Sequence, residues 1–537
     1  MSDSLRRFAR WASEISFADI PDTVVEAAKS QVFSTLGSVH AGYRSELGGP
    51  IQDAFGGAAG SGSHAMPAGL PTSPSQAAFL MAAWGVVLDF DDIMLGGHTG
   101  HSTVLVPFAY AEPKAASGRD LLLAQITANE ITARVNMTVA LGPARGQMAS
   151  HVHLLGAAAA RASLERLNIE QFAESLGFAL SQPPRALYPG FLGSDAKVLC
   201  AAWPVRMGLE SVDAVKAGLR GNASILDQPR GFISTFARVP VREFLDGLGE
   251  RWHTATNSIK LYPACGYLNA ALDATVSLVR THDIDADTVE SVEVRASIFT
   301  VGMDAHSSPY LRGPQSLIST LTFSVPYTVA CAILDRDLSV DHLTRERIAD
   351  PRIWRMAEKV RVVHDMEHTI GSVLADIPIG AAIKRARGLG GLRFLLGVGG
   401  TGLVGKLMLA EPIGFFRLLQ ALRKVAGTEE PLDLSRSTKQ LSATVRIRNT
   451  RGQIFEETVT IPRGFAGSGD WQTLRSLARE KYCTQAATVI GMPNALQAAD
   501  LIDNLDDLEP GDVKRLVQLN CEARPLVRGR RELSPTS

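Results

Sequence analysis

Apolar residues recur every three or four positions through most of the first 250 residues, the spacing that places them on one face of an α-helix. This pattern predicts amphipathic helices over 21–39 and 118–137. Segments 75–90 and 153–167 are alanine-rich and apolar nearly all round, which is typical of helices buried at the centre of a domain. Glycine, proline and serine fill 56–75 and predict a loop there.

The pattern changes after about residue 255, where short segments alternate between apolar and polar positions. Such alternation predicts β-strands, and we expect four of them, over 289–297, 359–365, 441–450 and 454–462. Helical spacing lies among them, as at 316–334, and returns at 471–491. This part of the chain is therefore expected to mix helices and strands.

At 537 residues the chain exceeds the length at which a single hydrophobic core stops growing, so two domains are expected. We predict an all-helical domain over 1–255, completed by 468–523, and a smaller α+β domain over 256–467. The last stretch, 524–537, is expected to be a polar tail. The predicted fold class is mainly α, with an α+β second domain.

Charge and cysteine content narrow the classes of partner and compartment. The 54 Lys and Arg residues balance 55 Asp and Glu residues, which gives a net charge of −1. This balance does not favour nucleic-acid binding. A small anion could still bind through a few local cations. Five cysteines without CxxC spacing predict neither a zinc site nor a disulfide framework, which makes a reducing cytoplasm the expected location. No uncharged apolar stretch reaches the ~18–20 residues of a membrane-spanning helix. The N-terminus is expected to be a surface helix rather than a targeting segment.

Residues 379–440 form an unusual segment inside the second domain. From Ile379 to Gly427 the chain is apolar and glycine-rich, with eight Lys and Arg residues and one acidic residue, Glu411. Three interpretations stay open: an extra helical hairpin packed on the domain or on a dimer partner, a peripheral membrane contact through 379–427, or a cover over an apolar substrate.

Acidic and imidazole side chains are concentrated in LDFDDIMLGGHTGHS, residues 88–102. Asp89, Asp91 and Asp92 lie within four positions, and His98 and His101 follow a glycine-rich turn. Clustering and burial raise carboxyl pKa values, so one of these groups is a candidate proton acceptor near neutrality, with an imidazole as the complementary acid. The alternative is a helix C-terminus whose aspartates cap neighbouring helices. No third group is tied in by spacing, so a metal is not expected.

Three further segments carry candidate residues. Gln147 and His153 flank the start of a buried helix, where polar side chains and a helix N-terminus favour an anion. Lys197 enters an otherwise apolar helix, where a lysine usually extends to solvent. Lys260 and Tyr262 lie at the change from helical to mixed pattern, a favoured place for a site. Cys265 follows them as a candidate substrate contact or nucleophile, or as a small buried residue.

Several common chemistries lack their motifs. The chain has no Walker loop, no GxGxxG fingerprint after a strand and no GxSxG elbow. Nucleotide-driven, hydride-transfer and serine-hydrolase reactions are therefore disfavoured.

Taken together and in this order, LDFDD, RGQMASHVHLLGAAAA, DAKVLCAAWPVRMGL and SIKLYPACGYLNAALDA resemble the MmgE/PrpD family. Its members include 2-methylcitrate dehydratase, cis-aconitate decarboxylase and iminodisuccinate epimerase. The resemblance covers roughly 5–375 and 440–490. It implies a large helical domain with a smaller α+β lid, a homodimer, no metal or organic cofactor, and a small di- or tricarboxylate substrate. It also implies that Asp89, Lys197 and Lys260 occupy the motif positions of the family site.

The chain departs from the family pattern at several site positions. Ile93 replaces the threonine after the paired aspartates, HTGHST replaces a His-Pro-Ser, and Cys200 replaces a histidine. Gln147 and Asn269 also stand where the family usually has histidines. The acid–base set is therefore rebuilt, and 379–440 resembles an insertion in the lid.

We expect a cofactor-independent lyase or isomerase that works on a small carboxylic acid. Dehydration, epimerisation and decarboxylation stay open. The candidate catalytic residues are Asp89, Asp92, His98, His101, Lys197, Lys260 and Tyr262. The lysines would hold substrate carboxylates and stabilise enolate-like charge. Gln147, His153 and Cys265 are the candidate substrate-binding residues. The alternative is a non-catalytic scaffold on the same fold, with the basic insertion gripping a partner or membrane.

Overall fold

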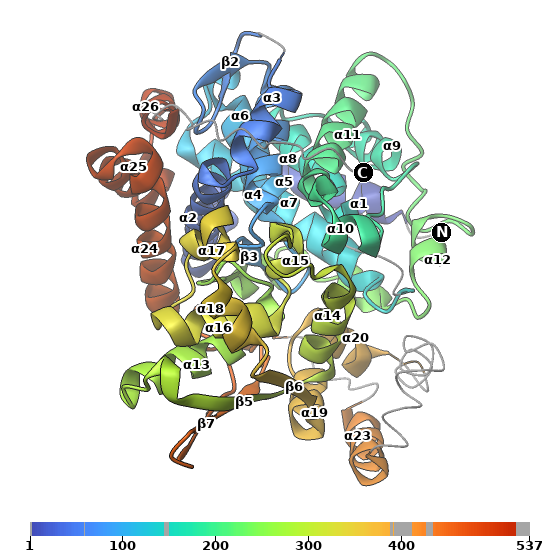
Figure 1. Ribbon diagram of the computed structural model, residues 1–537. Coiled ribbons are helices and arrows are strands. Elements are labelled where there is room, and N and C mark those ends of the chain that lie inside the picture. Colours follow the sequence, from blue (N-terminus) through green and yellow to red (C-terminus); the bar gives the residue numbers. More distant parts are fainter. Residues whose placement is uncertain are drawn as a thin grey trace, which may run out of the picture.

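The computed structural model describes residues 3–57, 60–143, 150–386, 390, 411–425 and 433–521. It confirms the predicted fold class, mainly α with a smaller α+β part. In Figure 1 the helices of the first half occupy the upper part of the molecule, and the largest sheet lies below them with its own helices. Gln147, the 524–537 tail and much of the 379–440 insertion lie outside the described residues.

The first half of the chain is a stack of helices. They are α1 (Ser4–Glu14), α2 (Asp22–Arg44), α3 (Gly48–Phe55), α4 (Pro74–Val86), α5 (Gly100–Thr103), α6 (Leu105–Lys114), α7 (Gly118–Thr138), α8 (Ser150–Leu164), α9 (Ile169–Ala179), α10 (Tyr188–Gly193), α11 (Leu199–Lys216) and α12 (Phe232–Phe236). Within 56–75, expected as a loop, β1 (Ser63–Ala65) and β2 (Leu70–Thr72) pair as a short antiparallel hairpin.

Helices α4 and α8 are buried as their all-round apolar pattern predicts. Ser73 caps α4 by accepting a hydrogen bond from the Gln76 amide, which fixes where the helix begins. Small residues let α8 approach α11 closely, because a Cβ on Gly208 would lie 2.3 Å from the Leu154 carbonyl oxygen. The centre of the molecule is therefore packed too tightly for larger side chains at this crossing.

The second part is built on a four-stranded sheet. Its strands are β5 (Val289–Ala296), β6 (Val360–His364), β7 (Ala443–Asn449) and β8 (Ile454–Val459), in the order β6-β5-β7-β8, with only the β5–β6 pair parallel. Each lies within a segment predicted from alternation. The described helices around it are α13 (Asn269–Thr281), α14 (Ile298–Ser307), α15 (Ile318–Leu321), α16 (Val325–Asp335), α17 (Arg345–Ile348), α18 (Pro351–Ala357), α19 (Met366–Leu374), α20 (Pro378–Arg385) and α23 (Pro412–Val425).

The helix expected over 316–334 is divided into α15 and α16. Ser324 accepts a hydrogen bond from the Tyr327 amide and Pro326 occupies the first turn of α16, so the sequence starts a new helix there. Phe323 and Leu321 are buried on both sides of the break. The apolar spacing predicts helix on both sides of the break, but the Ser324 cap and Pro326 divide it into two helices.

The chain then returns to the helical part. Helices α24 (Trp471–Ile490), α25 (Met492–Asp503) and α26 (Pro510–Cys521) follow the sheet, and α24 packs along α2 at the left of Figure 1. A second short pairing joins the two parts, because β3 (Asp92–Ile93) is antiparallel to β4 (Ser258–Ile259). The packing of α24 on α2 and the pairing of β3 with β4 bring residues from distant parts of the chain close to the acidic motif.

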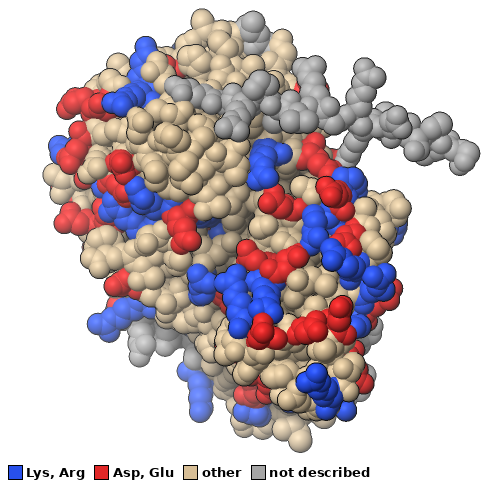
Figure 2. All heavy atoms as spheres, turned by 60° about the vertical axis from the view of Figure 1, so that its left-hand side comes forward, with Lys and Arg blue, Asp and Glu red and all other residues tan. Residues whose placement is uncertain are grey.

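The outer surface carries no field of one sign on the face drawn in Figure 2, where basic and acidic side chains are interspersed. Among the described helices, none combines the length and apolarity required to cross a bilayer. The five cysteines all lie in the described ranges, and no disulfide joins them there.

Candidate active site

The acidic motif forms a five-residue turn, Asp89–Ile93, which we call the acid loop. It follows the end of α4, and Asp89 reverses the chain with a φ of 52°, a left-handed conformation that aspartate tolerates better than most residues. The reversal lets β3 pair with β4. Because Lys260 follows β4 directly, the pairing brings its side chain under the loop.

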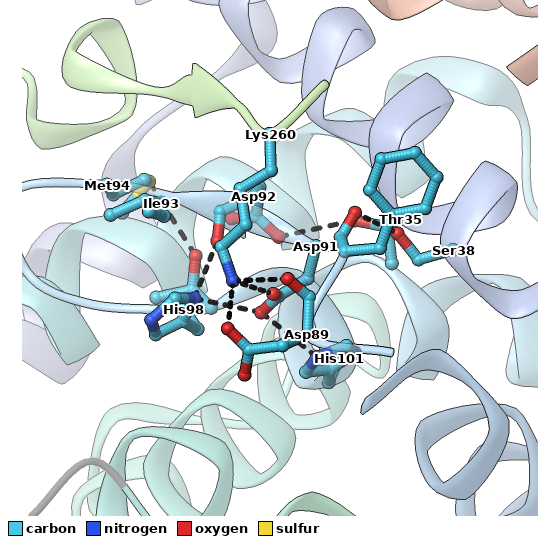
Figure 3. A network of polar contacts seen from close by, with 12 residues as sticks. Thr35, Ser38, Asp89, Asp91, Asp92, Ile93, Met94, His98, His101 and Lys260 are labelled. Carbon is cyan, nitrogen blue, oxygen red and sulfur yellow. Dashed lines mark hydrogen bonds and ion pairs between the residues drawn. The ribbon is translucent and has the colours of Figure 1, made fainter. Parts of the chain in front are cut away.

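Lys260 is fully buried and binds two carboxylates of the loop. Its Nζ lies 2.9 Å from Oδ2 of Asp89, 2.6 Å from Oδ1 of Asp91 and 2.8 Å from the Asp89 carbonyl oxygen. Figure 3 shows the ammonium pointing down into this group of oxygens. Burial lowers the pKa of Lys260, but the two carboxylates outweigh it and hold that pKa above its ordinary value. The lysine is therefore a permanent cation beneath the loop.

Lys197, which is distant from Asp89 in the sequence, also contacts it. It lies in the 3₁₀ turn Asp195–Val198 before α11 and is buried, not extended to solvent. Its Nζ is 3.1 Å from Oδ1 of Asp89, yet the angles do not make this contact a hydrogen bond. The ammonium also lies 4.9 Å from the centre of the Phe323 ring. Its N–H donors are consequently left for another acceptor.

The expected rise in carboxyl pKa does not occur at Asp89 and Asp91. Burial raises the pKa of Asp89, but Lys197 and Lys260 outweigh burial and lower it to about 2. Burial likewise raises the pKa of Asp91, and His98 and Lys260 outweigh it, so that pKa is well below 3.8. At these two of the three carboxyls, two cations outweigh the effect of clustering and burial.

Asp91 connects the lysine to the histidines. Its Oδ2 lies 2.9 Å from Nδ1 of His98 and 3.2 Å from Nε2 of His101, while its other oxygen binds Lys260. Figure 3 shows both rings turned toward the acid loop. One carboxylate thus holds a lysine and two imidazoles in a fixed arrangement.

His98 is the more accessible of the two imidazoles. Its side chain is 28% exposed, whereas that of His101 is fully buried. Nδ1 of His98 is also 2.8 Å from the Asp92 carbonyl oxygen, so Nδ1 carries the N–H and Nε2 makes no contact with the described residues. Burial lowers the pKa of His98, but the charge of Asp91 outweighs it and raises that pKa above 6.5. His98 is therefore an oriented imidazole whose protonated form is favoured by Asp91.

A small cavity of about 20 Å³, room for about one water molecule, lies over this group. Its walls are Val86, Asp89, Asp91, His98, His101, Ser150, His153, Phe191 and Cys200. Burial lowers the pKa of His153 well below 6.5 and raises the pKa of the Cys200 thiol to about 12, so both are neutral. Lys197 and Lys260 are not among these walls, but Lys197 lies beside Asp89, and Lys260 binds Asp89 and Asp91. Cations this close to the cavity favour an anionic ligand.

Asp92 points away from the cavity. Its carboxyl accepts a hydrogen bond from Nε2 of Gln31 at 2.8 Å, and burial followed by the charge of Asp91 raises its pKa. Gly100 makes room for it, since a Cβ there would lie 2.3 Å from Oδ1 of Asp92. The glycine of the HTGH turn is thus required by the close approach of this carboxyl.

Two further candidates lie outside the cavity walls. The Tyr262 hydroxyl donates to Oδ1 of Asp273 at 2.9 Å, and burial raises its pKa. Cys265 is buried near Lys260, and burial raises the pKa of its thiol to about 12, which does not favour a nucleophile. No group of three or more His, Cys, Asp or Glu side chains in the described ranges is placed to hold a metal ion.

Two buried lysines beside the acid loop were not singled out from the sequence. Lys481 of α24 lies on the same helical stripe as Ala478, Tyr482 and Ala486, all of them buried, and this apolar stripe is the signal that identifies it. Lys439, just before β7, has no such pattern around it. Both donate to backbone carbonyls of the acid loop.

Comparison with known proteins adds an independent observation. Models of the MmgE/PrpD N-terminal and C-terminal domains match residues 6–244 and 262–375. A cis-aconitate decarboxylase of Aspergillus terreus (strain NIH 2624 / FGSC A1156) is 23% identical over 380 residues, which cover 66% of this chain and 77% of the relative. A second cis-aconitate decarboxylase from Aspergillus terreus is 23% identical over 378 residues, covering 65% and 76%. The two domain matches together span more than half of the chain.

Proposed function

Because this chain belongs to the MmgE/PrpD family, we propose that it is a lyase that removes carbon dioxide from a small di- or tricarboxylate, with His98 as the proton donor. The family and the two decarboxylase relatives support lyase-type chemistry in general. The single observation that supports this reaction is the Asp91–His98 pair at the wall of the cavity, with Lys197 and Lys260 beside Asp89.

A substrate carboxylate would bind a cation whose N–H donors are not all used by the carboxylates of the acid loop. Lys197 holds Asp89 at 3.1 Å without hydrogen-bond geometry, so its N–H groups are free to donate to a substrate carboxylate. The Phe191 and Phe323 rings around its ammonium exclude water from one side. A desolvated ammonium interacts with an anion more strongly than an exposed one.

The proposed step breaks the bond between a carboxylate carbon and the adjacent carbon. The electron pair stays on that carbon and is delocalised into a neighbouring double bond or carboxylate, where Lys197 and Lys260 stabilise the charge. Carbon dioxide leaves, and Nε2 of His98 delivers its proton to the carbanion. Asp91 keeps Nδ1 protonated and orients the ring, and water restores the proton on Nε2.

His153 supports a second candidate function. Its imidazole is neutral, lines the same cavity and has no partner on Nδ1 among the described residues. A neutral imidazole accepts a proton, so α-proton abstraction followed by loss of hydroxide or reprotonation is the alternative. That reaction would be a dehydration or an epimerisation.

Proton NMR of the purified protein in D2O with cis-aconitate, citrate, 2-methylcitrate and iminodisuccinate tests the proposal. Decarboxylation yields a product with one carboxylate fewer and one deuterium, either at the former carboxyl-bearing carbon or at the far end of a conjugated double bond. Exchange of an α-proton without loss of carbon supports the His153 alternative. No change with any acid, together with no saturable binding of them by calorimetry, would favour a non-catalytic scaffold.

A further inference from the structure

Side chains bind nearly every backbone carbonyl of the acid loop. The Asp89 carbonyl accepts from Lys260 at 2.8 Å and the Asp92 carbonyl lies 2.8 Å from Nδ1 of His98. The Phe90 carbonyl accepts from Lys481 and from Oγ of Ser38, the latter at 2.6 Å. The Ile93 carbonyl accepts from Lys439. Four of the five loop carbonyls are therefore bound by side chains from outside the loop. These bonds set the direction of the carboxylates between them.

Lys481 and Lys439 take part in this arrangement without touching the cavity walls. We infer that both are positioning residues, which hold Asp89 and Asp91 in their productive orientation by binding the acid-loop carbonyls. The inference rests on the proposed function for its link to catalysis. It concerns two residues beyond the segments matched by the family models, which end at 375.

Lys481 approaches the loop from α24. Its other contacts are Oγ of Ser34 at 2.9 Å and the face of the Phe90 ring at 4.1 Å. No carboxylate pairs with it among the described residues, although it is buried. Burying an amino group without an ion pair costs stability, whereas burying an apolar side chain does not. The lysine is therefore explained by its N–H donors, which bind the loop carbonyl.

Lys439 approaches from the sheet-containing part. Its Nζ donates to the Thr256 carbonyl at 2.8 Å and to Oγ of Ser258 at 2.9 Å, in addition to Ile93. It thereby joins both sides of the β3–β4 pairing to the segment that leads into β7. The position of the sheet-containing part is thus linked directly to the acid loop.

Steady-state kinetics of the full-length Lys481→Met, Lys439→Met and Lys481→Gln variants tests the inference. Lys29→Met is the matched control, because Lys29 is also buried on α2 but binds Glu26, Asp506 and the Asp503 carbonyl, away from the loop. We expect each Met variant to lose about tenfold to a hundredfold in kcat with KM within twofold, since a small misplacement of the catalytic groups is enough. Lys481→Gln retains an N–H donor and should recover part of that loss.

Equal kcat in wild type and both Met variants would overturn the inference, and so would equal losses in Lys29→Met. If wild type turns over none of the acids, the proposed function fails, and amide hydrogen exchange decides the inference separately. Exchange in residues 88–98 should then be at least several-fold faster in Lys481→Met and Lys439→Met than in wild type and Lys29→Met. Unchanged exchange in that segment would show that the two lysines do not hold the loop.

Discussion

The Oδ2 atom of Asp91 lies 2.9 Å from Nδ1 of His98. This contact fixes the tautomer of the imidazole and leaves Nε2 as the atom that exchanges a proton with a ligand of the cavity. The other oxygen of Asp91 binds Lys260, so the carboxylate stays ionised and favours the protonated form of His98. The pH behaviour of the site therefore depends on Asp91.

Asp91→Asn should shift the pH dependence of the reaction. His98 has a raised pKa in the folded protein, so a reaction that uses its proton declines as the pH rises through that value. Without the negative charge the decline should move to lower pH by about one to two units, with a fall in kcat. The measurement is kcat/KM from pH 5 to 9 for both proteins. A descending limb at the same pH in both would mean that another group supplies the proton.

Lys260→Met should cost stability in a way that depends on pH. Removing the cation leaves two buried carboxylates without their principal partner, which costs about 3–5 kcal/mol at neutral pH. The folded-state pKa values of Asp89 and Asp91 then rise, so protonation at lower pH relieves the loss. Urea unfolding at pH 7 and pH 5 measures this.

The control for that experiment is Lys216→Met. Lys216 pairs with Glu165, but its side chain is 38% exposed, so its removal should cost under about 1 kcal/mol at either pH. Equal losses in the two variants would contradict the view that Lys260 compensates buried charge.

The two carbonyl-binding lysines should make the protein more stable as the pH rises above 7. Burial lowers the pKa of both Lys439 and Lys481 from 10.5 to about 7. Between these values the unfolded chain binds more protons than the folded one, so the free energy of unfolding increases with pH, by up to about 1.4 kcal/mol per pH unit for each lysine. The increase is lost as the pH falls toward 7.

Lys481→Met should therefore reduce the slope of stability against pH between 7 and 8.5, where the thiols, unchanged in the variant, contribute equally to both proteins. Urea unfolding at three pH values in that interval measures the slope. The Lys29→Met variant, whose lysine is ion-paired, serves as the comparison. Identical slopes in wild type and Lys481→Met would show that the lysine is fully charged in the folded protein.

Much of the fold could be predicted from apolar spacing, because burial imposes the helical and strand periods directly. The four strands of the large sheet, the buried helices α4 and α8, and helix α24 lie where the pattern placed them. The break between α15 and α16 depends on one serine cap, which spacing alone does not reveal.

The site was less accessible to sequence reasoning. Spacing could not distinguish His98 from His101, because the short helix α5 begins at Gly100 and buries only the second ring. The carboxylate at the centre, Asp91, was not among the selected catalytic residues, since the left-handed turn at Asp89 decides which side chains face the cavity. Such a reversal has no signal in residue type beyond a tolerance for positive φ.

The most direct measurement is the transfer of deuterium to product by wild type and His98→Asn in D2O, with the acid that wild type turns over. We expect His98→Asn to lose about 10²–10⁴ in the rate of deuterium incorporation, because general acid catalysis contributes that much. His64→Gln, which alters a histidine paired with Glu112 away from the cavity, should retain the wild-type rate. A His98→Asn protein that incorporates deuterium at the wild-type rate would contradict the assignment of His98 as the proton donor.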